Sequence, residues 1–434
     1  MNLALIGIIG ILVLLIVLFF LGMPVGIAMG VVGFVGFSYV INLKAAMGMV
    51  GNDIWGTFSS YGLTVIPLFI FMGYLTFNSG IAAKLYETAY TWVGHWRGGL
   101  AIATIGADEL FAAICGSNTA TAATMGAVAL PQMKKYNYDT RLSSGTVVTG
   151  GTLGNIMPPS VTLIILALQT EQSIVKLFLG GFLPAILLGS LFVVTISILC
   201  RLDEKLGPAG PKTTFKEKIL SLTGIFEAAA IFLLVIGGLY AGIFTPTEAG
   251  AAGVFLALAV TVPFGKLKWK DLMNAMSETL KISCMVFVLI TGAIIFGRFM
   301  AVTRLPYALA EFATSLPVSP YVILSVILLI YLIGGCIVDS LGFLVLTIPI
   351  FFPLGMALGF DPIWFSIIIT MVTTMGAMTP PVGVNIYVVK ALAPDISLAT
   401  IFRSASYFLV ACVVSLVILI IFPDIILFIP NLAG

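Results

Sequence analysis

The sequence predicts an all-α polytopic membrane protein, because it contains few charges and because apolar segments recur along its whole length. Of the 434 residues, 60% are hydrophobic and 9% are charged, whereas soluble globular domains carry about 25% charged residues. So few charges cannot cover the surface of a water-soluble chain of this size. The net charge of +2 does not indicate a nucleic-acid partner. The expected surroundings are a lipid bilayer.

Ten apolar segments approach the length of about 20 residues that a helix needs to cross a bilayer. They lie near 3–21, 24–41, 57–78, 141–168, 174–200, 219–243, 246–264, 281–300, 362–389 and 400–428. The first lacks the basic start and the small-residue cleavage site of a signal peptide, so it is expected to be a retained helix.

Two further apolar blocks, 98–133 and 320–356, are interrupted in the middle by polar and small residues. The interruptions lie at 115–120 and 334–342. Each half-block has about 15 residues, which is short for a full crossing and predicts a re-entrant helical hairpin. A polar turn at membrane depth is tolerated only where it is buried in protein or lines a wet cavity.

Basic residues orient the chain in the membrane. The predicted crossings place three basic groups on one side: Lys134, Lys135 and Arg141; the loop 201–218; and Lys266, Lys268 and Lys270. The positive-inside rule makes that side cytoplasmic, and both termini are then expected outside. Arg304 departs from the pattern, since it falls on the opposite side.

The two halves of the chain repeat one another at a constant offset. The same offset relates Pro24 to Pro246, Ser117 to Asp339, Pro131 to Pro353, Gly154 to Gly376, and Pro158-Pro159 to Pro380-Pro381. Residues 1–218 and 219–434 are therefore predicted to be two repeats, each with five crossings and one hairpin. Because five is odd, the second repeat is expected to be inverted, an architecture typical of secondary transporters. The alternative is that apolar segments resemble each other by chance.

The first repeat contains a crossing, about 141–168, that is expected to be broken. Residues 143–160 combine glycines, hydroxyl side chains and a double proline. Proline removes a backbone donor and ends the helix before it, so the freed carbonyl groups are expected to need partners. Hard cations prefer oxygen ligands. We therefore expect a first sodium site between this break and the hairpin tip, built from Ser117, Asn118, Thr119, Thr149, Gly150, Gly151, Gly154 and Asn155.

The crossing at about 362–389 repeats this pattern, with a double proline and similar oxygens at 373–382. The matching tip carries Asp339, and an ionised group at membrane depth is a functional-site hypothesis by default. The second sodium site is expected to use Gly335, Asp339, Ser340, Thr374, Gly376 and Thr379. For any single glycine, close packing of helices is an equally good explanation. The occurrence of a hairpin tip and a broken crossing in both halves favours a functional role over close packing alone.

The substrate is expected to lie between the two tips. Arg298 is the preferred partner for a substrate carboxylate and Arg304 is the alternative, because arginine makes bidentate pairs with carboxylates. Either side chain could instead extend along a helix end to reach the membrane surface. Ser160 and Asn385 are further candidates. The sequence has none of the common nucleotide-binding, hydrolase or zinc-peptidase motifs, so we expect no catalytic residue, no cofactor and no metal other than the coupling sodium ion.

Four motifs resemble the large membrane subunit of tripartite ATP-independent periplasmic transporters. They are Cys-Gly-Ser-Asn-Thr-Ala-Thr-Ala (115–122), Met-Pro-Pro-Ser (157–160), Thr-Pro-Thr-Glu-Ala-Gly (245–250) and Thr-Pro-Pro-Val-Gly-Val-Asn (379–385). The resemblance covers essentially the whole chain. It implies an elevator-type transporter of the bacterial inner membrane, in which a mobile transport domain contains both hairpins, with sodium sites at their tips.

The resemblance also implies two partners, a small four-helix membrane subunit and a periplasmic substrate-binding protein. The chain begins almost directly with the first crossing, so the small subunit is expected to be separate. Substrates of the family are carboxylates such as C4-dicarboxylates, sialic acids and sugar acids. The Ser-Asn-Thr tip also resembles divalent-anion sodium symporters. A stand-alone symporter therefore remains an alternative, as does a non-transporting membrane scaffold or enzyme.

Overall fold

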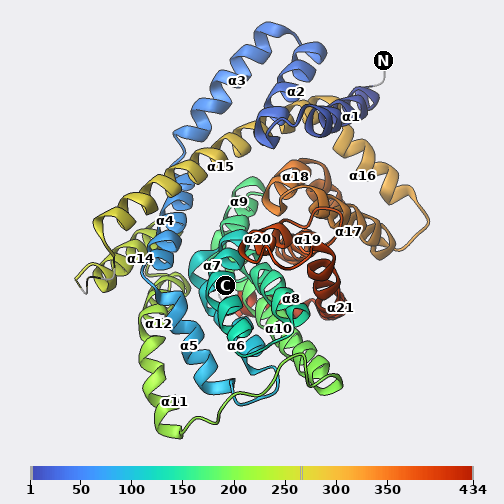
Figure 1. Ribbon diagram of the computed structural model, residues 1–434. Coiled ribbons are helices and arrows are strands. Elements are labelled where there is room, and N and C mark those ends of the chain that lie inside the picture. Colours follow the sequence, from blue (N-terminus) through green and yellow to red (C-terminus); the bar gives the residue numbers. More distant parts are fainter. Residues whose placement is uncertain (1–2, 264, 266, 433–434) are drawn as a thin grey trace.

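The computed structural model describes residues 3–263, 265 and 267–432, and these residues contain helices, turns and no strand (Figure 1). The first half contains α1 (Leu3–Leu21), α2 (Val25–Val40), α3 (Leu43–Phe58), η1 (Tyr61–Thr64), α4 (Val65–Asn78), α5 (Ile81–Val93), α6 (Gly99–Cys115), α7 (Asn118–Lys135), α8 (Thr140–Gly151), η2 (Thr152–Asn155), α9 (Val161–Gln169) and α10 (Ile174–Leu202). Lys266, one of the basic residues used for orientation, lies outside the described residues.

The second half continues the helical pattern. It contains α11 (Phe215–Ser221), η3 (Leu222–Gly224), α12 (Phe226–Phe232), η4 (Leu233–Gly237), α13 (Gly238–Tyr240), α14 (Pro246–Thr261), α15 (Trp269–Thr303), α16 (Leu305–Ser315), α17 (Pro320–Ile337), α18 (Ser340–Ala357), α19 (Pro362–Gly376), α20 (Val384–Leu392), α21 (Leu398–Ile421) and α22 (Asp424–Leu432).

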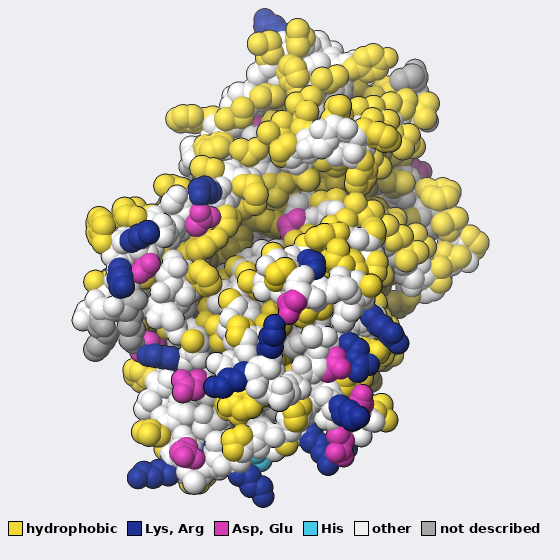
Figure 2. All heavy atoms as spheres, in the orientation of Figure 1, with side chains coloured by type: hydrophobic (Ala, Val, Ile, Leu, Met, Phe, Trp, Pro, Cys, Tyr) yellow, Lys and Arg dark blue, Asp and Glu magenta, His cyan; other side chains and the backbone are white. Residues whose placement is uncertain are grey.

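The polytopic membrane class is confirmed. Within the described chain, seven helices are long and apolar enough to cross a membrane, or eight if the bent pair 215–224 and 226–240 is counted as one span. Helix α1 buries only Gly7, Gly10 and Leu14, so most of its apolar surface is left for lipid or another apolar partner. Figure 2 shows the charged side chains gathered in the lower half of the view, where α5 and α11 lie, and a mostly hydrophobic upper half.

Several predicted boundaries were wrong. Helices α3 and α5 were not expected, because both mix apolar with polar residues and a search for continuous apolar segments passes over them. The predicted crossing at 281–300 is only part of α15, which has 35 residues. The arms of the second hairpin, α17 and α18, have 18 residues each rather than about 15, so their length does not by itself identify them as re-entrant.

The helices form two groups along the long helix α15 (Figure 1). Helices α2, α3 and α4 pack against α15, and α14 packs against α4. The two hairpins and the two broken crossings form the other group. Within it the halves of the chain intermix, since α8 packs on α21 and α7 packs on α20. The fold therefore brings segments from opposite halves of the sequence into one unit.

The correspondence between the halves extends to the starts of helices. Ser117 and Asp339 each occupy the N-cap position of the second hairpin arm, and Asp139 and Asp361 each cap the helix that leads into a break. The two prolines of each break are joined by a cis peptide bond. Both halves thus place polar residues at the starts of corresponding helices, but Asp339 accepts a capping hydrogen bond from the Leu341 N–H whereas the Ser117 side chain accepts none.

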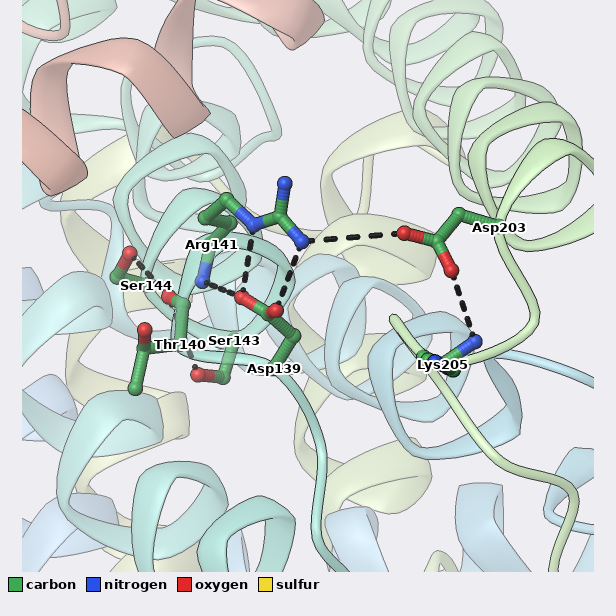
Figure 3. Close-up of polar contacts among 7 residues, drawn as sticks. All are labelled: Asp139, Thr140, Arg141, Ser143, Ser144, Asp203 and Lys205. Atoms are coloured by element: carbon green, nitrogen blue, oxygen red, sulfur yellow. Dashed lines mark hydrogen bonds and ion pairs between the residues drawn. The ribbon is translucent and has the colours of Figure 1, made fainter.

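Asp139 also belongs to an ionic cluster at the start of α8 (Figure 3). Its carboxylate accepts hydrogen bonds from the backbone and the guanidinium of Arg141, at 2.7–3.0 Å. Arg141 also lies 3.8 Å from the Asp203 carboxylate. The hydrogen bond from the Arg141 side chain lowers the pKa of Asp139. A lowered carboxyl pKa stabilises the fold above the ordinary value of about 4, and that stabilisation is lost as the pH falls through the folded-state pKa.

We predict that Asp139→Ala lowers the free energy of unfolding by about 1 kcal/mol, the usual cost of losing an N-cap. Asp361→Ala should have a similar effect, because its side chain accepts from two backbone N–H groups of α19. Thermal unfolding of the purified protein at neutral pH would measure both. Glu311→Ala, which alters an exposed side chain of α16, should change little. Equal melting temperatures for all three variants would contradict the capping role.

Candidate ion and substrate site

The first hairpin turns at Gly116 and Ser117, between α6 and α7. Gly116 has a φ of +62°, a left-handed conformation that favours glycine. A Cβ there would also overlap the carbonyl oxygen of Pro159. The Gly116 carbonyl accepts a hydrogen bond of 3.2 Å from the backbone N–H of Val161. The tip is thus held against the broken crossing of its own repeat.

The second hairpin turns at Val338 and Asp339 and is held in a similar way. The carbonyl of Cys336 accepts from the backbone N–H groups of Val382 and Gly383, at 3.1 and 3.2 Å. The Ser340 hydroxyl donates to the Thr373 carbonyl at 3.4 Å. The interruption is shorter than predicted, because α17 continues through Gly335 as far as Ile337.

Glycines let each tip touch its break. A Cβ on Gly154 would lie 2.5 Å from the carbonyl oxygen of Ser117. A Cβ on Gly376 would overlap the backbone of Gly335. Both polar tips therefore pack against residues inside the broken crossings, which is the protein cover that a polar turn requires at membrane depth.

Some of the freed carbonyls have partners within the protein, and the binding of sodium by the others stays a prediction. Helix α8 is regular through Gly151, and the break begins at Thr152. The Thr149 carbonyl accepts from the Thr152 hydroxyl at 2.6 Å. The Asn155 carbonyl accepts from the Ser160 hydroxyl at 2.8 Å. The backbone of the break therefore leaves fewer open acceptors than proline chemistry alone suggests.

Side chains supply the open oxygens instead. Among the described residues, the amide of Asn118 and the hydroxyls of Thr121 and Thr149 are buried without a hydrogen-bond partner, as is the amide oxygen of Asn385. An unsatisfied buried polar group costs about 1–3 kcal/mol. Thr121 Oγ1 also lies beside Gly154, 2.9 Å from a Cβ placed there. Neutral oxygens at a helix break suit a dehydrated monovalent cation, so the residues of the first site fit sodium.

The two tips meet at a cavity of about 400 Å³. Its polar wall consists of Ser117, Asn118, Thr119, Thr124, Asn155, Thr162 and Asp339. Its apolar wall includes Tyr74 and Phe77 of α4 together with Met285 and Val286 of α15. The cavity therefore lies between the group formed by the hairpins and broken crossings, called the hairpin unit below, and helices α4 and α15. Its size suits a small organic molecule.

The structure brings together most of the residues expected at the first site. Ser117, Asn118, Thr119 and Asn155 line the cavity, and Gly154 touches the tip. Two predicted members face elsewhere. Gly150 packs against Asp108 of α6, and Gly151 packs against Ala122 of α7 and the amide nitrogen of Asn385.

The second site is assembled only in part. Gly335 packs against the backbone of Thr373, and the Ser340 hydroxyl donates to the Thr373 carbonyl. Gly376 packs against the backbone of Gly335, and Asp339 lines the tip cavity. The Thr374 hydroxyl accepts a hydrogen bond of 3.4 Å from the Asn155 amide, so it connects the two breaks. The Thr379 hydroxyl donates to the Met375 carbonyl at 2.7 Å.

The three residues expected to bind substrate lie outside the tip cavity. Arg298 donates a hydrogen bond of 3.3 Å to the Asp53 carboxylate and lines a second cavity, of about 670 Å³. Ser160 is fully buried, and its hydroxyl caps α9 by accepting from the Leu163 N–H. Asn385 is fully buried, and its amide donates to the Val148 carbonyl at 3.0 Å. Their assignment to the substrate stays a prediction.

Several site residues were missed in the sequence, including Thr124 of the cavity wall. Thr121 lies one helical turn after Asn118, a spacing that places both on the same side of a helix, so it could have been found. Thr162 donates to the Asn155 amide oxygen at 3.2 Å, and Thr373 provides the carbonyl that Ser340 contacts. These two contacts depend on how the segments fold back, which spacing does not specify.

Known proteins share extensive sequence similarity with this chain. Residues 12–425 match the family model described as "Tripartite ATP-independent periplasmic transporter, DctM component". The chain is 34% identical to the C4-dicarboxylate TRAP transporter large permease protein DctM of Pseudomonas aeruginosa, over 88% of this chain and 89% of the relative. It is 30% identical to the sialic acid TRAP transporter large permease protein SiaM of Vibrio cholerae, over 96% of each chain.

Among solved structures, the fold is similar to the Alcanivorax borkumensis YdaH transporter. The TM-score is 0.65 at 16% identity, and the match covers 88% of this chain and 90% of the other. At this identity the likeness concerns the fold alone. It agrees with the all-α polytopic fold predicted from the sequence.

Proposed function

This chain belongs to the tripartite ATP-independent periplasmic transporter family as its DctM component, and on that premise we propose that it imports small organic acids by sodium symport. The observation that carries the proposal is the meeting of two hairpin tips and the first broken crossing at one cavity, with the second broken crossing packed against the second hairpin. Broken helices near the middle of a membrane protein are the usual ion and substrate sites of secondary transporters.

Sodium would bind first at the tips. At the first tip, the open oxygens of Asn118 and Thr121 replace water around the ion, and the N-terminus of α7 leaves free N–H groups for an anionic substrate beside it. At the second tip, sodium would offset the charge of Asp339. Each ion then makes the cavity more favourable for a carboxylate, which explains why substrate and sodium would move together.

An elevator movement of the hairpin unit along α15 accounts for the two cavities. The tip cavity contacts Met285 and Val286 in the first half of α15, and the second cavity contacts Ala293 and Arg298 in its second half. From Met285 to Ala293 the helix rises about 12 Å at 1.5 Å per residue. A shift of this order would carry the tips from one cavity to the other. At the second position Arg298 could pair with the substrate if the carboxylate displaced Asp53.

The proposed setting follows from the same premise. The side that carries Lys134, Lys135 and Lys268 is cytoplasmic, and the termini are periplasmic. A small four-helix membrane subunit covers part of the apolar surface, and a periplasmic binding protein delivers the substrate. The relatives named above transport C4-dicarboxylates and sialic acid, which share a carboxylate group. The proposed substrate class is therefore small carboxylates, with the choice among them made by the binding protein.

Reconstitution tests the proposal. The chain and its small subunit are placed in proteoliposomes, and uptake of a radiolabelled carboxylate is measured with and without binding protein and an inward sodium gradient. We predict uptake only when both are present. Uptake without binding protein would favour the alternative, a stand-alone sodium symporter. Uptake that does not depend on the sodium gradient would contradict the proposed ion sites. A lack of uptake of every carboxylate tested, with all partners present, would contradict the transport function itself.

A further inference from the structure

The tip cavity has two walls of opposite chemistry. In the described part of the chain, every polar side chain of its lining except Tyr74 belongs to the hairpin unit. Helices α4 and α15 form the opposite wall with the side chains of Ile70, Tyr74, Phe77, Ile282, Met285 and Val286. A molecule in the cavity would therefore meet hydrogen-bonding groups at one end and hydrocarbon at the other.

The tip cavity also lacks a positive side chain. In the described part of the chain no Lys, Arg or His lines it, and Asp339 is its one acidic residue. Proteins that bind a carboxylate tightly usually pair it with arginine. Here a carboxylate depends on the N-terminus of α7, which is equivalent to about half a positive charge, and on the sodium ions proposed above.

The sum of these charges limits the substrate to one carboxylate. A sodium ion at the second tip is balanced by Asp339. A sodium ion at the first tip has neutral ligands, so its charge is balanced by a single substrate carboxylate. A second carboxylate would leave a net negative charge in a cavity at membrane depth, where an unpaired charge is energetically costly.

The second cavity gives the same answer. Its charged lining residues in the described chain are Asp53, Glu171 and Arg298, so acids outnumber bases there too. The one positive group is already paired, because Arg298 donates a hydrogen bond of 3.3 Å to Asp53. If a substrate carboxylate displaced Asp53 from Arg298, no further positive side chain of the described lining would remain for a second carboxylate.

An apolar stripe of α15 connects the two cavities. Ile282 and Val286 line the first cavity, and Ile290, Ala293 and Ile294 line the second. Their spacing of three or four residues places them on one side of the helix. No charged residue occurs between Ile282 and Ile294. During the proposed shift along α15, a substrate with an apolar end would therefore keep its hydrocarbon contact while its carboxylate stays with the tips.

We propose that the chain transports monocarboxylates with an apolar chain of several carbon atoms. The carboxylate lies at the hairpin tips and the chain lies against α4 and α15. Dicarboxylates fail on charge. Polyhydroxylated acids fail because hydroxyl groups facing the apolar wall lose their hydrogen bonds to water. This inference rests on the proposed function, and the binding protein then chooses among acids of this class. The class differs from the C4-dicarboxylates and the sialic acid of the relatives.

Three acids of equal chain length test charge and polarity separately. Hexanoate has one carboxylate and an apolar chain, adipate has a second carboxylate, and gluconate has one carboxylate and a hydroxylated chain. Each is titrated into the purified complex of the chain and its small subunit, in sodium and in choline buffer. Binding is measured as the rise in melting temperature. We expect hexanoate to bind in sodium, and adipate and gluconate to bind at least about tenfold more weakly.

Each result decides one part of the proposal. Adipate binding as tightly as hexanoate would overturn the limit to one carboxylate. Gluconate binding as tightly as hexanoate would overturn the role of the apolar wall. If hexanoate gave no stabilisation, or the same stabilisation in choline as in sodium, the assignment of this substrate class to the sodium-loaded cavity would be wrong.

A charge placed on the apolar wall should reverse the preference. Met285 lines the tip cavity and is 59% exposed, so Met285→Lys adds a positive charge without overpacking the wall. We expect this variant to bind adipate about tenfold more tightly than wild type does and to bind hexanoate less tightly. Met285→Gln, which is similar in length and neutral, is the matched control and should keep the wild-type order. Equal binding of adipate by the two variants would contradict the charge argument.

Binding and uptake together separate this inference from the proposed function. Sodium-dependent binding of hexanoate, without uptake of any carboxylate by the full complex, would refute the transport function and support the substrate class. Sodium-driven uptake by a complex that binds adipate most tightly would refute the substrate class and leave the transport function standing.

Discussion

Gly376→Ala is expected to remove sodium-dependent uptake almost completely. The new Cβ would overlap the backbone of Gly335 in α17, and a backbone atom cannot rotate away as a side chain can. Inserting a methyl group into a packed contact costs about 1–3 kcal/mol, and each 1.4 kcal/mol is a factor of about ten in affinity. The second tip would move off its break, and the oxygens expected to hold sodium would separate. A sodium titration of uptake in proteoliposomes measures the loss.

Gly154→Ala should act in the same way at the first tip, where its Cβ would lie 2.5 Å from the Ser117 carbonyl oxygen. The matched control is Gly106→Ala in α6, because a Cβ there meets nothing within 4 Å. It should keep wild-type uptake. If Gly376→Ala and Gly106→Ala transport equally well, the close packing of tip against break is not needed for transport.

Asn118→Ala is expected to weaken sodium binding by about tenfold or more, since hydrogen bonds and ligands from buried polar groups are worth about 1–3 kcal/mol. Asn118 is 4% exposed and its amide has no partner in the described part of the protein, so removing it breaks no internal hydrogen bond there. The expected defect is therefore in ion affinity and not in folding. The control is Thr146→Ala, whose hydroxyl is already bonded to the Leu142 carbonyl of its own helix.

Asp339→Ala should produce a comparable defect at the second tip, where it removes the only acidic side chain of the cavity wall described above. Both variants should insert in the membrane and elute as a single species in detergent. Sodium activation curves would show a shifted midpoint with an intact maximum at high sodium. Unchanged sodium dependence in both variants would remove the assignment of the two sites.

Contacts between distant segments account for the residues that the sequence misplaced. Gly150 was expected near sodium because it lies among glycines and hydroxyls, but helix α8 turns it toward Asp108. Asn385 was expected at the substrate, but α20 packs on α7 and α8, and the amide bonds to Val148. Arg298 was expected near the tips, yet the unforeseen helix α3 brings Asp53 to it. In each case the partner lies on a different helix, far away in the sequence, beyond the reach of any local pattern.

The sequence by itself determined the membrane class, the two hairpins, the two breaks and the correspondence between the halves. These features depend on local chemistry. The length of an apolar segment decides whether it can cross the membrane, and proline and glycine end a helix. Both signals occur at corresponding positions of the two halves. The tertiary structure alone decided which oxygens stay without a partner and which side chains reach the cavity. Those outcomes depend on the packing of helices from both halves, where a single Cβ decides whether two backbones can touch.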